Sequence, residues 1–284
     1  MIALEVKGLN KKYRDFHLKD VSFQLEKGYI MGFIGANGAG KTTTIKSILN
    51  MIQLESGEVH ILGKNMAEHE LELKQDIGFA FGGIDFYTRS KIKKLTDVIK
   101  KFYKNWDDET YYNYLRRFKL DENKKIVDLS KGMKVKYSLA LALSHGANLL
   151  ILDEPTSGLD PVARDDLLDI FQELVLNGEI SILFSTHITS DLEKCADLIT
   201  FIENGQIIHS SEKEEFKESY RMLNGNETQL NQVKERLISY KINSFGFTGL
   251  IRSCDFDTSS DIKATIPSLE EIMIYFAKKE DMYV

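Results

Sequence analysis

Cysteine is scarce in this chain, with only Cys195 and Cys254 among its 284 residues. Their spacing matches neither a metal site nor a disulfide scaffold, so we expect a reducing compartment and two inert packing residues. Long hydrophobic runs are also missing, because no stretch of about 18 consecutive apolar residues occurs. The first residues lack a basic segment followed by an apolar one, which argues against a secretion signal. The sequence therefore predicts a cytosolic chain without direct membrane insertion, which reaches a membrane only through a partner.

The chain also lacks an excess of positive charge, since its formal net charge is −6. Binding along a nucleic-acid duplex needs a broad basic face, and this balance does not supply one. We therefore expect no nucleic-acid partner. Hydrophobic residues make up 43% of the chain, which is enough for a sizeable core in one large domain or two ordinary ones.

A glycine-rich segment joins a predicted buried strand at 29–34 to a predicted helix at 44–49. It fits the pattern G-x-x-x-x-G-K-[ST] and is followed by one more threonine. Glycine lets successive backbone N–H groups approach phosphate oxygens, and the helix N-terminus adds positive potential. In this pattern Lys41 bridges the β- and γ-phosphates and Thr42 offers its hydroxyl to Mg²⁺. The predicted triphosphate-binding residues are Gly35, Asn37, Gly38, Ala39, Gly40, Lys41, Thr42 and Thr43.

An aromatic residue upstream of this loop is a candidate for stacking on a nucleotide base. Tyr13 and Phe16 both lie between two predicted strands, at 2–6 and 18–25. We favour Tyr13 as the stacking residue. The alternative is a tyrosine that packs under a hairpin, and judged without fold context the two interpretations are equally supported.

Two carboxylates follow a short apolar run at 148–152, which predicts a central parallel strand. At the end of such a strand Asp153 would hold Mg²⁺ and Glu154 would polarise the water that attacks the γ-phosphate. The alternative, in which these residues only cap a helix, requires the phosphate loop to be accidental. His187 ends a second predicted strand at 180–186, and we favour a γ-phosphate contact for it over a purely structural role.

The remaining chain has two distinct patterns. From about 90 to 147 the spacing of apolar residues predicts a helical insertion, and we expect a stripe of aromatic residues to form its core. The stripe comprises Phe102, Tyr103, Trp106, Tyr111, Tyr112 and Tyr114. Beyond residue 212 we expect a small α/β appendage with a helix at 229–239, strands near 244–254 and 262–266, and a final capped helix at 268–278.

Taken in this order, the motifs make residues 1–212 resemble the nucleotide-binding subunit of an ATP-binding cassette (ABC) transporter. Residues 129–133, Leu-Ser-Lys-Gly-Met, are similar to the family's Leu-Ser-Gly-Gly-Gln signature, although Lys131 and Met133 depart from it. Residues 157–160, Ser-Gly-Leu-Asp, resemble its D-loop, and His187 resembles its switch histidine. The resemblance implies that Ser130 and Gly132 bind the γ-phosphate of ATP across a dimer interface, and that Asp160 is a further ATP-binding residue.

The resemblance also implies a fold. It is a P-loop NTPase core with a RecA-like parallel sheet, an antiparallel β subdomain and a helical subdomain at about 90–147. The ATPase domain would cover 1–212 and an accessory domain 213–284. One feature departs from the family: its usual proline-glutamine pair is replaced by Gly82-Gly83 after Phe81. The glutamine's role is then either lost or carried by a neighbour such as Asp85, for which the alternative is a turn cap.

A finer resemblance is to the ATPase subunits of bacterial type-2 exporters of antimicrobial peptides or phenol-soluble modulins. It rests on residues 102–107, 128–134 and 267–272. It implies Mg-ATP as the ligand, an integral membrane permease and a second ATPase subunit, identical or different, as partners, and a peripheral location on the inner face of the cell membrane. The substrates would be peptides or other amphipathic toxic compounds.

Two alternatives to a transport ATPase differ in what they require of the sequence. A soluble cassette ATPase that acts on a ribosome or DNA typically has two cassettes in one chain, or coiled coils or basic arms. This chain has one cassette and an acidic balance. A catalytically silent regulatory subunit would be expected to lack Glu154 or His187, and both are present. The sequence therefore favours transport.

Overall fold

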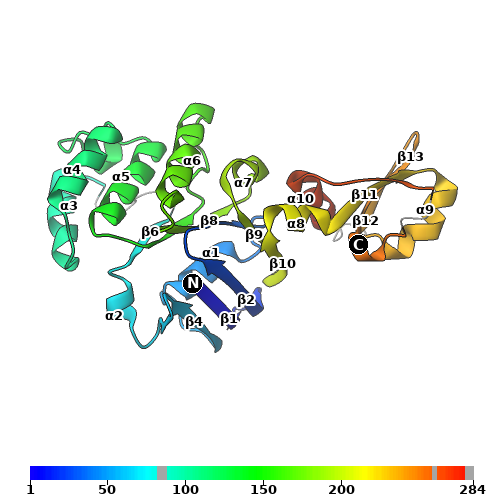
Figure 1. The fold of residues 1–284 in the computed structure, drawn as a ribbon, viewed down its shortest axis with the longest axis horizontal. Coiled ribbons are helices and arrows are strands. Elements are labelled where there is room, and N and C mark those ends of the chain that lie inside the picture. The colour runs from blue at the N-terminus through cyan, green and yellow to red at the C-terminus, as the bar shows by residue number, and fades with distance from the viewer. Residues whose placement is uncertain (82–87, 258–260, 279–284) are drawn as a thin grey trace. The chain divides into compact units, whose positions relative to one another are not determined.

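The computed structural model describes residues 1–81, 88–257 and 261–278. They fall into two compact units with a boundary between Ile208 and His209 (Figure 1). The domain assignment made from the sequence, with its division after residue 212, stays a prediction. Within the described ranges, no helix is both long enough and apolar enough to cross a membrane.

The first unit is built around a six-stranded sheet with the order β10-β9-β3-β8-β7-β6. Every residue of β3, β7 and β8 is buried, so both faces of these strands are covered, as is usual for a parallel sheet. The pairings among β9, β3, β8, β7 and β6 are all parallel, which confirms the predicted α/β core. The strands are β3 (Ile30–Ile34), β6 (Ile77–Phe81), β7 (Leu149–Asp153), β8 (Ser181–Thr186), β9 (Leu198–Glu203) and β10 (Gln206–Glu212).

The register of this sheet brings three strand ends to one edge. Asp153, the last residue of β7, pairs with Ser185 of β8 on one side and with Phe81 of β6 on the other. Ile34, the last residue of β3, pairs with Thr186 of β8. Because parallel strands end at the same edge, the segments that follow β3, β7 and β8 lie next to one another.

An antiparallel sheet with the order β2-β1-β4-β5 packs beside the central sheet in the same unit. Its apolar side chains alternate along β2, where Val21, Phe23 and Leu25 are buried. They share one core with residues of β3, β7 and α1 (Lys41–Ile48), so the phosphate-loop helix lies against both sheets. The strands are β1 (Ile2–Lys12), β2 (His17–Glu26), β4 (Ser56–Ile61) and β5 (Lys64–Asn65).

The helical insertion is present and contains α3, α4 and α5. Its buried centre joins three side chains, because Thr96 Oγ1 lies 2.8 Å from Tyr111 Oη and 2.7 Å from Tyr137 Oη. Besides α1, the helices of the first unit are α2 (Glu70–Leu73), α3 (Ile92–Ile99), α4 (Asp108–Arg117), α5 (Lys131–Ser144), α6 (Pro161–Val175) and α7 (Thr189–Cys195), with 3₁₀ turns η1 (Lys100–Phe102) and η2 (Ile126–Asp128) (Figure 1).

The expectation that the aromatic stripe forms the core of the insertion is wrong for part of the stripe. Tyr111 is buried, but Phe102 is 72% exposed and Tyr112 is 43% exposed. The chain leaves α3 at Ile99 and enters α4 only at Asp108. Phe102 lies between these points and therefore does not continue one helical face, whereas Tyr112 directly follows Tyr111 in α4 and points to another side of that helix.

The second unit is an antiparallel sheet with the order β12-β13-β11-β14 and short helices. Its core is formed by Leu223, Leu230, Val233, Phe247, Ile251 and Ile262. The elements are α8 (Lys213–Glu218), β11 (Tyr220–Gly225), α9 (Glu227–Val233), η3 (Lys234–Arg236), β12 (Ser239–Asn243), β13 (Gly246–Arg252), η4 (Ser253–Asp255), β14 (Lys263–Thr265) and α10 (Leu269–Ala277).

The predicted helix at 229–239 is wrong in its second half. The helix ends at Val233, and Ile238 N donates to Leu250 O of β13 over 2.8 Å. Pairing with β13 therefore draws this segment into the sheet, a non-local contact that helical periodicity does not reveal. The predicted cap of the last helix is correct, because Ser268 and Glu271 form a reciprocal capping box.

Candidate functional site

The phosphate loop joins β3 to α1, and two of its glycines are required by their surroundings. A Cβ on Gly35 would lie 2.4 Å from Ile202 O, and one on Gly40 would lie 2.8 Å from a ring carbon of Phe16. Gly40 also has φ +114° at the N-cap of α1. Gly38 has φ +85° but open space around it, so its requirement is conformational only.

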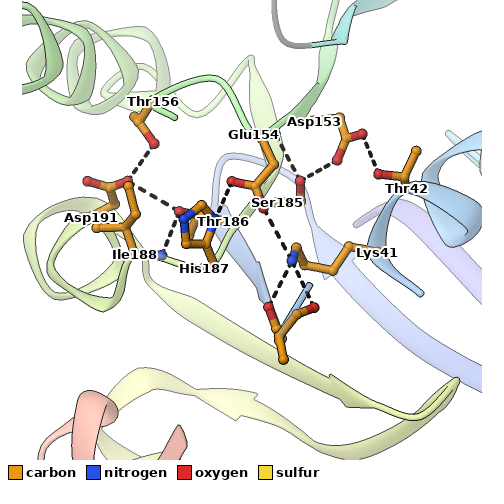
Figure 2. Close-up of polar contacts among 12 residues, drawn as sticks. Lys41, Thr42, Asp153, Glu154, Thr156, Ser185, Thr186, His187, Ile188 and Asp191 are labelled. Carbon is orange, nitrogen blue, oxygen red and sulfur yellow. Dashed lines mark hydrogen bonds and ion pairs between the residues drawn. The ribbon is translucent and has the colours of Figure 1, made fainter. Parts of the chain in front are cut away.

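Lys41 points back into this loop. Its Nζ donates to Gly35 O over 2.8 Å and to Ala36 O over 3.3 Å, and it lies 3.2 Å from Glu154 Oε1 (Figure 2). Only 6% of the Lys41 side chain is exposed. A buried ammonium group needs such partners to offset its lost hydration. The loop therefore holds one positive charge next to the carboxyl end of β7.

Thr42 and Asp153, the two predicted metal-binding residues, are in direct contact. Thr42 Oγ1 donates to Asp153 Oδ2 over 2.7 Å, and Ser185 Oγ donates to Asp153 Oδ1 over 2.5 Å. Hydroxyl and carboxylate oxygens are ligands that suit Mg²⁺. Among the described residues, no group of three or more His, Cys, Asp and Glu side chains could hold a metal ion. The pair therefore fits Mg²⁺ only if phosphate oxygens and water complete the octahedron.

Glu154 and His187, the two predicted catalytic residues, also meet. His187 Nδ1 lies 2.8 Å from Glu154 Oε2, and the side chains are 41% and 23% exposed respectively (Figure 2). Asp153, by contrast, is only 8% exposed. Of the two adjacent carboxylates, Glu154 is therefore the one that a water molecule in the cavity can reach.

A cavity of about 730 Å³ lies over these groups. Both Tyr13 and Phe16 line it, so the structure does not separate the two candidates for base stacking, and the preference for Tyr13 stays a prediction. Asp15 and Ser157 also line the cavity and were not among the predicted residues. Asp15 lies on a bend that no pattern singled out, and Ser157 begins the segment that resembles the D-loop, in which only Asp160 was predicted to bind ATP.

Ser130, Gly132 and Asp160 do not line this cavity. Ser130 caps α5, where its Oγ accepts from Met133 N over 3.2 Å, and Gly132 is buried in the first turn of that helix. Asp160 caps α6 by accepting from Val162 N and Ala163 N. Their predicted contact with ATP therefore needs a second chain and stays a prediction.

Two buried polar residues of the site were missed by sequence reasoning. Ser185 contacts Asp153, as described above, and Asp191 is fully buried where it accepts from Thr156 Oγ1 over 2.6 Å and pairs with Arg164. Ser185 had no distinguishing signal in the sequence, because β8 contains a second serine, Ser181. Asp191 had none either, because an acidic residue in a first helical turn is ordinary. The residues Gly82, Gly83 and Asp85 lie outside the described part of the chain, so the predictions made for them stay open.

Comparisons with known proteins agree with this geometry. A family model described as ABC transporter matches residues 18–157. The ABC transporter ATP-binding protein YtrB of Bacillus subtilis (strain 168) is 36% identical over 204 residues, which cover 72% of this chain and 69% of YtrB. The bacitracin transport ATP-binding protein BcrA of Bacillus licheniformis is 36% identical over 194 residues, covering 66% of this chain and 62% of BcrA. A solved ATP-binding subunit of an ABC transporter superposes with a TM-score of 0.68 at 28% identity, over 76% of this chain and 92% of that one.

Proposed function

Because the chain belongs to the ABC transporter family of ATP-binding, ATP-hydrolysing subunits, we propose that it is the ATPase that powers a separate membrane permease. The observation that carries this proposal is the meeting of the phosphate loop with the carboxyl end of β7. Lys41 contacts Glu154, and Thr42 contacts Asp153. One edge of the sheet thus brings together a buried cation, a hydroxyl–carboxylate pair that suits Mg²⁺ and a solvent-accessible carboxylate.

Each of these residues has a distinct task in the proposed hydrolysis. Lys41 and the N–H groups of the loop would hold the β- and γ-phosphates. Thr42 and Asp153 would hold Mg²⁺, which when bound neutralises phosphate charge. Glu154 would accept a proton from the attacking water, and His187 would orient the Glu154 carboxylate and contact the γ-phosphate.

We further propose that two ATPase subunits close head-to-tail around two ATP molecules. The support is the position of Ser130, which is exposed at the N-terminus of the 14-residue helix α5 and does not line the cavity of its own chain. A helix N-terminus attracts anions, so this end of α5 suits the γ-phosphate bound by a partner. The partner would be an identical or a different ATPase subunit.

The permease would dock in an apolar groove of the first unit. The groove has a volume of about 220 Å³ and is lined by Leu49, Met51, Lys74, Ile77, Phe79 and Tyr103. Met51 is 51% exposed and Phe79 is 45% exposed, so two large apolar side chains face solvent there. Tyr103 belongs to the helical insertion and the other residues to the core. We propose that a short helix of the permease lies in this groove, which keeps the chain at the inner face of the cell membrane.

The proposed cargo is peptides or other amphipathic toxic compounds. It is supported by the sequence similarity to the bacitracin transport protein BcrA. The test is to purify the chain from native membranes in mild detergent, identify the copurifying protein and reconstitute both in vesicles. We expect an integral membrane permease that stimulates ATP turnover, with peptide transport that stops in Lys41→Ala. Recovery with ribosomes, and no membrane partner, would overturn the transport role in favour of a soluble ATPase.

A further inference from the structure

Ser185 lies between the two carboxylates at the end of β7, and no predicted role covers it (Figure 2). Its hydroxyl donates to Asp153 Oδ1 over 2.5 Å and accepts from the backbone N–H of Glu154 over 2.9 Å. The side chain is fully buried. We propose that Ser185 is a positioning residue for ATP hydrolysis, which fixes the orientation of the Asp153 carboxylate and of the turn that carries Glu154. This inference rests on the proposed function of Asp153 and Glu154.

The first part of the argument concerns the backbone of Glu154. Glu154 has φ +50°, a left-handed backbone conformation that residues other than glycine rarely adopt. The chain turns sharply there, and the Glu154 side chain leaves the line of β7. The Glu154 N–H donates to two oxygens of Ser185, the hydroxyl at 2.9 Å and the carbonyl oxygen at 3.2 Å. Ser185 therefore stabilises the turn that aims Glu154 at His187 and Lys41.

The second part concerns the carboxylate of Asp153. One of its oxygens accepts from Ser185 and the other accepts from Thr42. With a donor on each oxygen, the plane of the carboxylate is fixed while lone pairs remain for further ligands. A serine hydroxyl has one proton, and the donation to Asp153 leaves its lone pairs to accept from Glu154 N–H. The bonds thus form a directed chain from Glu154 N–H through Ser185 to Asp153, and neighbouring bonds in such a chain strengthen one another.

The strand β8 contains a matched control. Ser181 is also fully buried and also accepts a backbone N–H, from Gly28 over 2.9 Å. It pairs with Leu149 at the opposite end of β7, four residues before Ser185 in β8. Replacing either serine with alanine removes the same atom from the same buried strand. Only the Ser185 change removes a donor from Asp153 and an acceptor from Glu154.

The experiment compares kcat for ATP hydrolysis in Ser185→Ala, Ser185→Cys, Ser181→Ala and Ser181→Cys. Cysteine nearly keeps the size of serine but is a weak hydrogen-bonding group, so it separates packing from hydrogen bonding. We expect kcat to fall about 10- to 100-fold in both Ser185 variants, the range typical for groups that hold a metal ligand or catalytic group, and to change less than about twofold in the Ser181 variants.

A binding measurement adds a readout that does not depend on turnover. Thermal stabilisation by ATP in EDTA should be unchanged in all variants, because Ser185 does not contact Lys41 or the loop. The additional stabilisation given by Mg-ATP should be smaller in the Ser185 variants, since Asp153 is less well oriented. If the substitutions instead only disrupt folding, the stabilisation by ATP in EDTA and the additional stabilisation by Mg-ATP should both fall. The Ser181 variants should then lose as much of each as the Ser185 variants.

Glu154→Gln, measured in parallel, separates failure of this inference from failure of the proposed function. If Glu154→Gln is inactive and both Ser185 variants keep wild-type kcat, or lose no more than their Ser181 counterparts, the positioning role is wrong while the function stands. If Glu154→Gln turns over ATP at the wild-type rate, the assignment of Glu154 fails first. The inference is supported if kcat falls in the Ser185 variants and not in the Ser181 variants, while the Ser185 variants still bind ATP in EDTA.

Discussion

Thr42 Oγ1 donates a hydrogen bond to Asp153 Oδ2 over 2.7 Å, although 111 residues separate the two in the chain. The bond connects the first turn of α1 to the last residue of β7. It brings together the two segments whose chemistry was most evident in the sequence. The contact between them is therefore the geometric basis for treating both as parts of one ATP site.

Lys41→Ala should abolish nucleotide binding. Lys41 is the buried cation inside the phosphate loop, and its removal leaves the triphosphate without that charge. ATP at about 100 times its Kd should stabilise the wild-type chain by about 2.7 kcal/mol, and this gain should disappear in the variant. Thermal unfolding with and without ATP measures the difference. Lys46→Ala, on the same helix but outside the cavity lining, should keep the full stabilisation; an equal response in the two variants would refute the assignment.

Ser130 offers a way to separate helix capping from ATP contact. Ser130→Ala removes the cap of α5 and should cost about 0.5–2 kcal/mol of stability. Ser130→Asp retains a good cap, so its stability should be close to wild type. Its negative charge would nevertheless face the γ-phosphate of the partner's ATP, and ATP-dependent dimerisation should be lost. A stable Ser130→Asp chain that dimerises normally with ATP would show that Ser130 only caps the helix.

Phe79→Asp should weaken attachment to the permease. The substitution places a charge in the apolar groove where the permease helix is proposed to lie. Leu176→Asp is a suitable control, because Leu176 is 82% exposed at the end of α6 and does not line the groove. Copurification with the membrane partner should fall for Phe79→Asp and not for Leu176→Asp. Equal recovery of the partner with both variants would place the docking surface elsewhere.

Burial of His145 should make stability depend on pH. Its ring stacks on Tyr103 with centroids 3.7 Å apart, and its Nδ1 lies 2.9 Å from Gln75 O. Burial lowers the pKa of His145 below its usual 6.5. As the pH falls through about 6.5, the unfolded chain gains a proton that the folded chain does not, so the free energy of unfolding decreases.

Urea unfolding between about pH 7.5 and about pH 5.5 tests this pH dependence. The loss of stability toward the lower pH should be smaller in His145→Gln, which does not titrate and can still donate to Gln75 O. Burial also lowers the pKa of His209, but that contribution is common to both proteins and cancels in the comparison. Parallel pH curves for wild type and variant would contradict the prediction.

The sequence predicts those parts of the site whose chemistry depends on residues that are neighbours in the chain. The loop around Lys41 needs glycines at fixed spacing, and Asp153-Glu154 follows an apolar strand, so both are visible locally. Ser185 became evident only from the register that pairs it with Asp153. Asp191 likewise gains meaning from Thr156 and Arg164, which approach it only in the folded chain.

The fold was predictable to the extent that local periodicity decides it. The parallel core follows from short apolar strands, and the last helix follows from the cap formed by Ser268 and Glu271. The second half of the helix expected at 229–239 was wrong because Ile238 bonds to Leu250, a partner that periodicity does not reveal. Phe102 was misplaced for a related reason, since its face depends on where α3 ends.

The most direct test of the account is sedimentation of Glu154→Gln with Mg-ATP, alongside its rate of ATP turnover. Glu154 is the solvent-accessible carboxylate that contacts both Lys41 and His187, and the amide cannot accept the proton of the attacking water. The account predicts that the variant binds ATP, turns it over at least about 100-fold more slowly than wild type, and accumulates as a dimer that forms only with ATP. A variant that remains monomeric in Mg-ATP and hydrolyses it at the wild-type rate would contradict the account.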